Sequence, residues 1–427
     1  MKKRLLLVAF HFPPLQGSTG VHRSLAFARY LGRHGWDVTV LTVTPGAYPR
    51  QSVDNNELIP EDIRIFRDRG FDAQRHLSIF GRYPRALATP DRWSSWIYSG
   101  VQAGRRLLRE WSPHAIFSTF PIASAHEIAW RLSRGSGLPW VADFRDPMGQ
   151  DGYPEDERIR KAYWALERRV IETCAAVTVT TEGTAGLYRT RYQEFPARRV
   201  RVIPNGFDEA AFPPLPDVAT TAGRPPGPCV FLHSGNLYPY ERNPEHFFQA
   251  VAELRAQGAI TPETVRFDLR GGGYADRYQP QLERLGIADV VRLLPGMPYR
   301  DALAEMHAAD VLMLFQAANC NRQIPAKLYE YLYVGRPVVG FTDPAGDTGQ
   351  LLTKLGIEAL APLDEVAAIK RVILGAVHAT KAGTACVPTR ETVMRFSRAG
   401  TTERLATLLD EVAIGTADAT LRGVGTP

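Results

Sequence analysis

The stretch PAKLYEYLYVGRPVVGF, residues 325–341, combines a helix start, a helix end and a buried strand. Pro325 suits the first helical position, with Ile324 before it as the cap, and Gly335 followed two residues later by proline suits the helix end. Residues 338–341 then predict a short buried strand. Because the side chain of Ile324 has no hydrogen-bond acceptor, the first N–H groups of this helix are predicted to lack a cap.

The charged residues of this helix point to an anion. Lys327 adds a positive charge in the first turn, where the helix dipole already favours negative groups, so the uncapped start suits a diphosphate. Glu330 lies three residues on, on the same face, where its carboxylate can accept hydrogen bonds from a ribose diol. The alternative is a half-exposed Lys/Glu ion pair on an ordinary helix.

The composition is that of a globular protein. The chain has 427 residues, 44% hydrophobic and 22% charged, a length typical of two domains. A net charge of +6 suits an anionic small substrate or a loose attraction to an anionic membrane, and no dense basic helix or aromatic RNA motif favours nucleic acid. The four cysteines form no CxxC motif or Cys/His cluster, which predicts a reducing compartment and no structural zinc.

The first residues, MKKRLLLVAF, imitate a signal peptide. Their apolar run is too short, however, and His-Phe-Pro-Pro follows where a cleavage site would need small residues. No run of about 18 apolar residues occurs that would predict a membrane span. We therefore expect a cytoplasmic protein, with a peripheral position at the inner membrane face as a further expectation.

The N-terminal half begins with a βαβ pattern. Residues 5–10 predict a buried strand, 21–34 a helix and 37–42 the next strand, joined by the loop HFPPLQGSTG. This loop follows the first strand, where doubly wound sheets bind ligands, and Gly17, Ser18 and Gly20 permit close approach of a phosphate or sugar. A plain tight turn is the alternative. The GxGxxG fingerprint is missing, which disfavours an NAD-dependent dehydrogenase.

Further polar residues follow later strands of this half. The expected strand ends of AIFSTFP and WVADFRDP and the helix between them carry Thr119, His126, Asp143, Arg145 and Asp146, which we take as candidate cleft or acceptor-binding residues. Two alternatives stay open. Asp143, Arg145 and Asp146 are also consistent with a structural ion network, and His126 with a histidine that is merely packed or solvated. Aromatic residues between 50 and 110 are consistent with an acceptor-sugar or lipid cleft or with buried packing.

A second βα series follows PPLPDVATTAGRPPGP, a stretch of linker composition. Its first strand leads into a loop with Gly235, Asn236 and Arg242, and another strand ends in the three glycines 271–273. Arg242 and Lys327 both come just after strand ends of one predicted sheet, so we expect them to converge on one diphosphate. Two unrelated surface cations are the alternative.

The predicted architecture is α/β, with two doubly wound parallel-sheet domains facing a cleft that holds a donor on one side and an acceptor on the other. A helix that crosses back and a disordered tail complete the chain. The predicted segments are an acceptor-side domain at 1–205, a linker at 206–228, a donor domain at 229–391, the helix at 392–413 and the tail at 414–427.

The order of these motifs resembles glycosyltransferase family 4. The resemblance rests on the P-x-x-G-x-x-G loop, RVIPNGFD, GNLYPYERNP, RGGG, and P-x-K-x-x-E-Y followed by GRPVV, and it covers residues 5 to 410. The opening segment and PWVADFRDP are similar to members from bacterial exopolysaccharide clusters. The resemblance implies a GT-B fold and retaining transfer of a sugar from a nucleoside-diphosphate sugar to a glycan or polyprenyl-linked glycan, with no obligatory metal or other cofactor.

The resemblance also implies roles for individual residues. Glu330 corresponds to the glutamate that holds the donor ribose. Arg242 and Lys327 are the residues expected to act on the diphosphate during catalysis. The remaining implied donor-binding positions come from four loops and are Gly235, Asn236, Gly271, Gly272, Gly273, Pro325, Gly17, Ser18 and Gly20.

Three positions depart from the family pattern. Arg322 stands where many relatives have a glutamate facing the transferred sugar, and Asn236 where they often have a basic residue. The strand end at 118–120 lacks a His-x-His motif. Two other functions are kept as alternatives: a nucleotide-sugar epimerase on the same two-domain fold, and a non-catalytic nucleotide-sugar-binding protein, which the departure at Arg322 keeps open.

Overall fold

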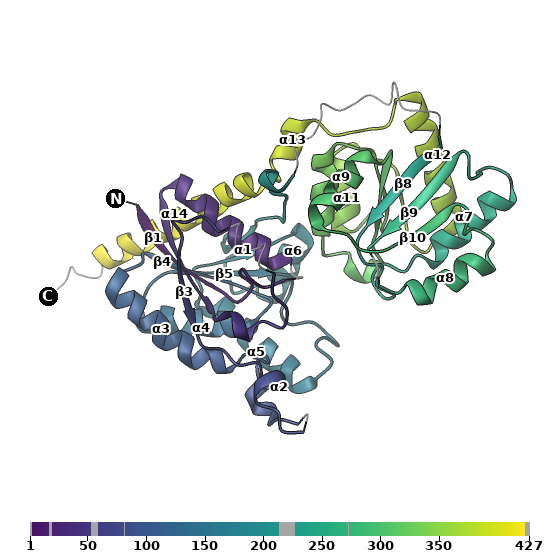
Figure 1. The fold of residues 1–427 in the computed structure, drawn as a ribbon. Coiled ribbons are helices and arrows are strands. Elements are labelled where there is room, and N and C mark those ends of the chain that lie inside the picture. The colour runs from purple at the N-terminus through teal and green to yellow at the C-terminus, as the bar shows by residue number, and fades with distance from the viewer. Residues whose placement is uncertain are drawn as a thin grey trace. The chain divides into compact units, whose positions relative to one another are not determined.

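The computed structural model describes residues 2–16, 19–52, 59–80, 82–212, 227–271 and 273–422. The chain forms two compact units (Figure 1). Unit 1 consists of residues 1–204 and 398–427, and unit 2 of residues 205–397. Among the described residues, no helix combines the length and the apolar character needed to cross a membrane.

Unit 1 contains a seven-stranded sheet in the order β3-β2-β1-β4-β5-β6-β7, with every neighbouring pair parallel. The order reverses between β1 and β4, and this switch point is where doubly wound sheets bind ligands at the carboxyl ends of their strands. The strands are β1 Lys3–Ala9, β2 Trp36–Val43, β3 Arg64–Asp68, β4 Ala115–Thr119, β5 Trp140–Arg145, β6 Ala176–Val179 and β7 Val200–Val202.

Both faces of this sheet are buried, because alternate residues of each strand point to opposite sides. On β1, Leu6 and Val8 pack in one apolar cluster, and Leu5 and Leu7 pack in the other. Helices α3, α4 and α5 cover the first face, and α1 and α14 the second (Figure 1). The helices described in unit 1 are α1 Thr19–Tyr30, α2 Ala73–His76, α3 Ser95–Trp111, α4 Ala123–Ser136, α5 Glu157–Thr173, α6 Glu182–Arg191 and α14 Arg398–Arg422.

Unit 2 contains a six-stranded parallel sheet in the order β10-β9-β8-β11-β12-β13, whose switch point lies between β8 and β11. Helices α7, α8 and α12 cover one face, and α9, α10 and α11 the other. The strands are β8 Cys229–Ser234, β9 Val265–Arg270, β10 Val291–Leu294, β11 Val311–Phe315, β12 Val338–Phe341 and β13 Leu360–Ala361. The helices are α7 Glu245–Ala256, α8 Ala275–Arg284, α9 Tyr299–Ala308, α10 Ala326–Val334, α11 Asp347–Lys354, α12 Val366–Ala382 and α13 Arg390–Met394.

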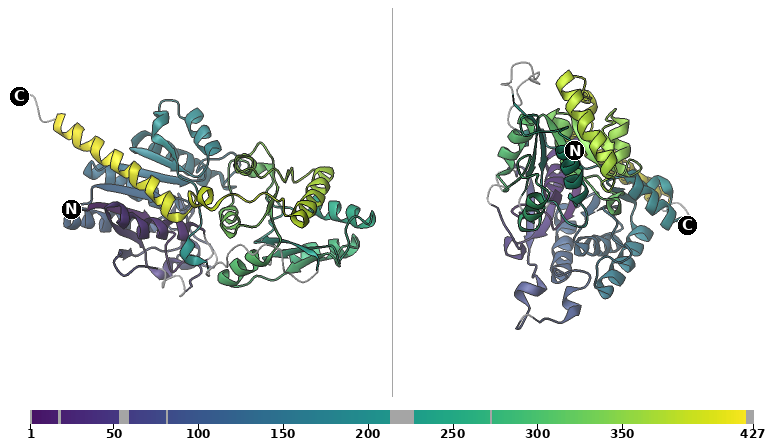
Figure 2. Two further views of the ribbon diagram at one scale, coloured as in Figure 1. Left: turned by 90° about the horizontal axis from the view of Figure 1, so that it is seen from above. Right: turned by 90° about the vertical axis from the view of Figure 1, so that its right-hand side faces the viewer.

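The single helix predicted at 392–413 is two helices, α13 and α14. The chain leaves the helical path because the carbonyl of Phe396 accepts a hydrogen bond from the N–H of Phe207 (3.3 Å) and Ser397 pairs with the same segment. The second helix continues to Arg422, where a disordered tail was predicted from residue 414. Residues 416–422 contain neither glycine nor proline, so nothing in that segment ends a helix. Figure 2 shows α14, in yellow, running along unit 1.

The segment before β8 also differs from a simple linker. Phe207 and Phe212 are buried and contact the ring of Tyr333, with ring centroids 4.3 and 4.5 Å away. The described start of the predicted linker at 206–228 is therefore packed against α10, because its two aromatic side chains bury apolar surface there. Residues 213–226 of that prediction lie outside the described residues.

Candidate active site

The start of α10 is the first part of the candidate site in unit 2. Pro325, rather than Ile324, is the residue that precedes the first helical turn (φ −58°, ψ 132°), one position later than predicted. Proline also lacks a side-chain acceptor, and no side chain caps this end of the helix. The helix therefore presents its first N–H groups and its positive dipole end without a side-chain partner, as the sequence predicted.

Lys327, in the first turn, points its ammonium group at the end of strand β8. Its Nζ atom donates to the carbonyl oxygen of Ser234 (2.6 Å) and lies 3.5 Å from Nε2 of His233. Loss of solvent and, second, the positive charge of Arg242 lower the pKa of Lys327 to about 7, and the carboxylate of Glu330 opposes that shift. Lys327 is thus a desolvated amine held against backbone, not half of an exposed Lys/Glu ion pair.

His233 is a site residue that sequence reasoning missed. It is fully buried on β8, and its Nδ1 atom lies 3.0 Å from the carbonyl oxygen of Met313. Burial, followed by the charge of Lys327, holds the pKa of His233 well below its usual value, so the ring is neutral. A carbonyl can only accept, so Nδ1 carries the proton and Nε2 directs its lone pair toward the ammonium group. A histidine inside the apolar run VFLHS was the available signal.

Two of the predicted glycines make room for this ammonium group. A side chain at Gly235 would collide with Nζ of Lys327, and the residue has φ +133°, which favours glycine. Gly271, with φ +151°, packs its backbone on that of Gly235, so that an added Cβ would lie 2.5 Å from the Gly235 carbonyl carbon. The N–H of Gly235 also donates to the carbonyl of Arg270 (2.6 Å). The ends of β8 and β9 therefore form a backbone floor beside Lys327.

Arg242 lies in the loop after β8, over the ring of Tyr238 at 5.3 Å, and contacts the carbonyl oxygen of Asn236 at 3.4 Å. The amide of Asn236 in turn donates to the hydroxyl of Tyr238 (3.1 Å). The guanidinium is close enough to lower the pKa of Lys327. The positive charge of Arg242 therefore acts on Lys327, and the binding of one diphosphate by the two cations stays a prediction.

Glu330 lies one turn further along α10 and is partly exposed. Its Oε1 atom accepts a hydrogen bond from the hydroxyl of Tyr299 (2.7 Å), the first residue of α9. This contact holds the carboxylate near the start of α9, on the same helix as Lys327. Of the other predicted positions, Gly273 has φ +70°, Arg322 is exposed, and Gly272 lies outside the described residues.

Family models match both halves of the chain. The model described as a glycosyl transferase 4-like domain matches residues 19–206, and the model described as glycosyl transferases group 1 matches residues 228–375. The chain belongs to the family 4-like glycosyltransferases. No curated protein sequence matches it.

Solved structures similar to this glycosyltransferase cover nearly the whole chain. HepE from Anabaena, solved with UDP and glucose, is 16% identical over 96% of this chain and 100% of its own, with a TM-score of 0.64. Sucrose-phosphate synthase from Thermosynechococcus elongatus is 15% identical over 99% of each chain, with a TM-score of 0.60. The lipopolysaccharide outer core galactosyltransferase WaaB is 15% identical over 97% of this chain and 99% of its own, also with a TM-score of 0.60. The predicted GT-B fold is confirmed.

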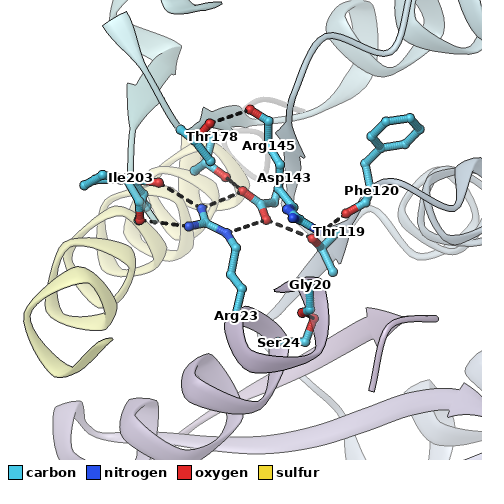
Figure 3. Close-up of polar contacts among 11 residues, drawn as sticks. Gly20, Arg23, Ser24, Thr119, Phe120, Asp143, Arg145, Thr178 and Ile203 are labelled. Atoms are coloured by element: carbon cyan, nitrogen blue, oxygen red, sulfur yellow. Dashed lines mark hydrogen bonds and ion pairs between the residues drawn. The ribbon is translucent and has the colours of Figure 1, made fainter. Parts of the chain in front are cut away.

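In unit 1 of this glycosyltransferase, Asp143 is the centre of a buried polar network (Figure 3). Its two carboxylate oxygens accept from Nε and Nη2 of Arg23 (3.0 and 2.9 Å), and the hydroxyls of Thr119 and Thr178 donate to them at 2.8 and 2.7 Å. Burial alone would raise the pKa of Asp143, but the charge and hydrogen bonds of Arg23 outweigh it, so the pKa is lowered. Arg23 also donates to the carbonyl of Ile203 (3.0 Å).

This network corrects the prediction that Asp143 and Thr119 contact an acceptor. Asp143 is fully buried, Thr119 is nearly so, and their polar atoms are used within the protein. The structural alternative fits better, but the partner of Asp143 is Arg23 on α1, which sequence reasoning missed, instead of Arg145. The contacts join α1 to strands β4, β5 and β6 and to Ile203, the residue that follows β7.

His126 is a second candidate that belongs to the core. It is fully buried on α4, its Nδ1 atom lies 2.7 Å from the hydroxyl oxygen of Ser118, and its ring packs against Phe144 at 4.9 Å. Burial lowers the pKa of His126 to about 3. A neutral histidine without solvent contact neither binds an acceptor nor exchanges protons with one, so its assignment to the cleft was wrong.

Gly20, in the first turn of α1, lies against Arg145, the last residue of β5. A side chain at Gly20 would collide with Nη1 of Arg145 and with the ring of His11, another residue that the sequence analysis did not single out. Burial lowers the pKa of Arg145, and the charge of Asp146 opposes the shift. Burial, followed by the charge of Arg145, lowers the pKa of His11 to about 3. Gly17 and Ser18, predicted in the same loop, lie outside the described residues.

Proposed function

We propose that the chain transfers a sugar from a nucleoside-diphosphate sugar to a hydroxyl group of a glycan or polyprenyl-linked glycan, with retention of anomeric configuration. One observation carries the proposal: Lys327 lies in the first turn of the uncapped α10, beside the backbone floor of Gly235 and Gly271 at the switch point of unit 2, where the charge of Arg242 also acts on it. The similar structure of HepE, which has also been solved with UDP-glucose, supports a nucleotide-sugar donor.

The chemistry requires stabilisation of a leaving diphosphate. As the bond between the sugar carbon and the diphosphate oxygen breaks, positive charge develops on the sugar ring and negative charge on the diphosphate. Lys327, Arg242 and the helix dipole are proposed to stabilise that negative charge. The acceptor oxygen bonds to the same carbon, and its proton passes to the released phosphate oxygen, so the step needs no carboxylate nucleophile.

Glu330 is proposed to orient the donor. Its carboxylate can accept hydrogen bonds from the ribose hydroxyls, and the hydroxyl of Tyr299 positions it through the 2.7 Å contact. We propose that no metal is required, because two cationic side chains already face the diphosphate. Among the described residues, no group of three His, Cys, Asp or Glu side chains is arranged to hold a metal ion.

The test uses the purified full chain and a panel of UDP-, GDP- and TDP-sugars. We expect one donor to raise the melting temperature, because a ligand that binds only the folded protein stabilises it, and the same donor to support transfer to a lipid-linked glycan. Release of an altered free sugar without an acceptor would instead show an epimerase. Donor binding without turnover on any acceptor would show a non-catalytic binding protein, the alternative that Arg322 keeps open.

Donor affinity should depend on pH through Lys327. Its pKa is about 7 in the free protein, and a bound diphosphate favours the charged form, so binding raises that pKa. Below pH 7 the amine is already protonated, whereas above pH 7 binding must take up a proton. Affinity should therefore fall as the pH rises above about 7, with a limiting slope of about tenfold per pH unit. Calorimetry in two buffers of different ionisation enthalpy measures this proton uptake directly.

Two variants control the assignment of this proton. Arg242→Gln should move the midpoint of the pH profile upward, because the charge of Arg242 is the second cause of the lowered pKa. Lys327→Arg keeps a positive charge at all these pH values and should abolish the dependence. A proton uptake that persists in Lys327→Arg would assign it to another group.

We also propose a role in polysaccharide biosynthesis in the cytoplasm. The similarity of the N-terminal segment and of PWVADFRDP to exopolysaccharide-cluster members supports the pathway, and the absence of CxxC spacing among the four cysteines supports the compartment.

A further inference from the structure

The segment from Phe71 to Arg92 in unit 1 exposes large apolar side chains at a tight turn. α2 and the loop after it extend outward from the body of unit 1 (Figure 1). Ile79 and Arg82 exchange backbone hydrogen bonds of 2.8 and 3.0 Å, which close the turn. Phe80, at its tip, is 101% exposed and Ile79 is 73% exposed, so both side chains stand in solvent. Leu87, a few residues on, is also exposed.

Acidic and basic side chains of this segment differ in their exposure to solvent. The segment has two carboxylates, and both are buried: Asp72 caps α2 and pairs with Arg92, and Asp91 accepts hydrogen bonds from Ser124. By contrast, Arg82 and Arg85 are exposed, and neither has an ion pair among the described residues. The solvent-facing charge of the segment is therefore positive.

A cavity of about 460 Å³ lies beside the turn. Its charged lining residues are Arg82 and Arg85 from the segment and Asp156 and Arg158 from the start of α5. The Oδ1 atom of Asp156 accepts from the N–H groups of Arg158 and Ile159 as the cap of that helix. Three guanidinium groups thus line the cavity together with one carboxylate, and this excess of positive charge suits a phosphate group.

We propose that this face of unit 1 docks on an anionic lipid bilayer. Ile79, Phe80 and Leu87 enter the interface between headgroups and acyl chains, and Arg82 and Arg85 bind lipid phosphates. Apolar side chains flanked by basic ones are the combination that binds such surfaces, because apolar burial adds to attraction by anionic lipids. A protruding tip has little area for a protein interface, which typically buries about 800 Å² on each partner. The docking does not depend on the proposed donor site.

The test is co-sedimentation of the full chain with vesicles, without any nucleotide sugar. We expect the protein to pellet with vesicles of phosphatidylcholine mixed with phosphatidylglycerol, to remain in solution with pure phosphatidylcholine, and to dissociate at high salt. Arg82→Gln/Arg85→Gln should weaken the binding about thirtyfold, since each arginine near an anionic surface contributes roughly fivefold. Ile79→Ser/Phe80→Ser should abolish detectable pelleting.

Matched variants separate docking from general charge and exposure. Arg284→Gln/Arg371→Gln removes two exposed charges from unit 2, and Ile414→Ser removes an exposed apolar side chain from α14. Both should bind vesicles as the unmodified chain does. Failure of the unmodified chain to bind anionic vesicles, or equal loss in the matched variants, would overturn the proposal. So would a change from dimer to monomer on Phe80→Ser in sedimentation without lipid, which would show a protein interface instead.

Discussion

Lys327→Met should lower the rate of sugar transfer by about 10²- to 10³-fold, the usual effect of removing one preorganised donor to a developing negative charge. Methionine keeps the apolar stem of the lysine and removes only its ammonium group. In the free protein the carbonyl oxygen of Ser234, 2.6 Å away, accepts a hydrogen bond from that group, and in the described part of the chain it forms no ion pair with a carboxylate, so it is available to the diphosphate. Steady-state kinetics with the donor identified by thermal shift measures the effect.

The control is Lys354→Met, which changes an exposed lysine at the last residue of α11 and should leave transfer unchanged. Thermal denaturation of both variants shows whether the fold is kept. If Lys327→Met folds normally and transfers sugar at the unmodified rate, the diphosphate does not bind at this helix start. If donor binding falls but the rate at saturating donor does not, Lys327 contributes to binding alone.

Most of the architecture was predictable from apolar runs. Residues 5–10 and 338–341, for example, are continuous buried runs, and both are strands of parallel sheets in the structure. The break between α13 and α14 was not predictable, because it depends on a hydrogen bond between Phe207 and Phe396, which are far apart in the chain. Local sequence at 392–413 favours a helix throughout, and a tertiary contact overrides it.

The candidate site also has features that were predictable from the sequence and features that were not. Pro325, Lys327 and Glu330 share one local pattern, and their relation was visible from helix geometry alone. The position of Lys327 against His233 was not, because it depends on the packing of α10 on the end of β8. Conversely, Asp143 and His126 follow the rule for strand ends and cleft residues, but burial places both in the core. Residue type and topology identify candidates, and solvent exposure selects among them.

The second large effect concerns stability. Arg23→Leu should lower the free energy of unfolding of unit 1 by about 3–5 kcal/mol, because it leaves the carboxylate of Asp143 buried without its counterion. Both side chains are almost completely buried, with 1% and 0% exposure. All seven tryptophans of the chain lie between residues 36 and 164, so urea unfolding followed by tryptophan fluorescence reports on unit 1.

An exposed ion pair of the same unit provides the contrast. Arg201 and Glu411 are 2.7 Å apart with side chains 45% and 50% exposed, and Arg201→Leu should cost only about 0–1 kcal/mol. The double variant Arg23→Leu/Asp143→Leu also removes the carboxylate that has lost its counterion, and it should recover part of the lost free energy of unfolding. Recovery stays incomplete because the hydroxyls of Thr119 and Thr178 lose their acceptor. Equal costs for Arg23→Leu and Arg201→Leu would mean that water reaches Asp143 and that the network does not hold α1 on the sheet.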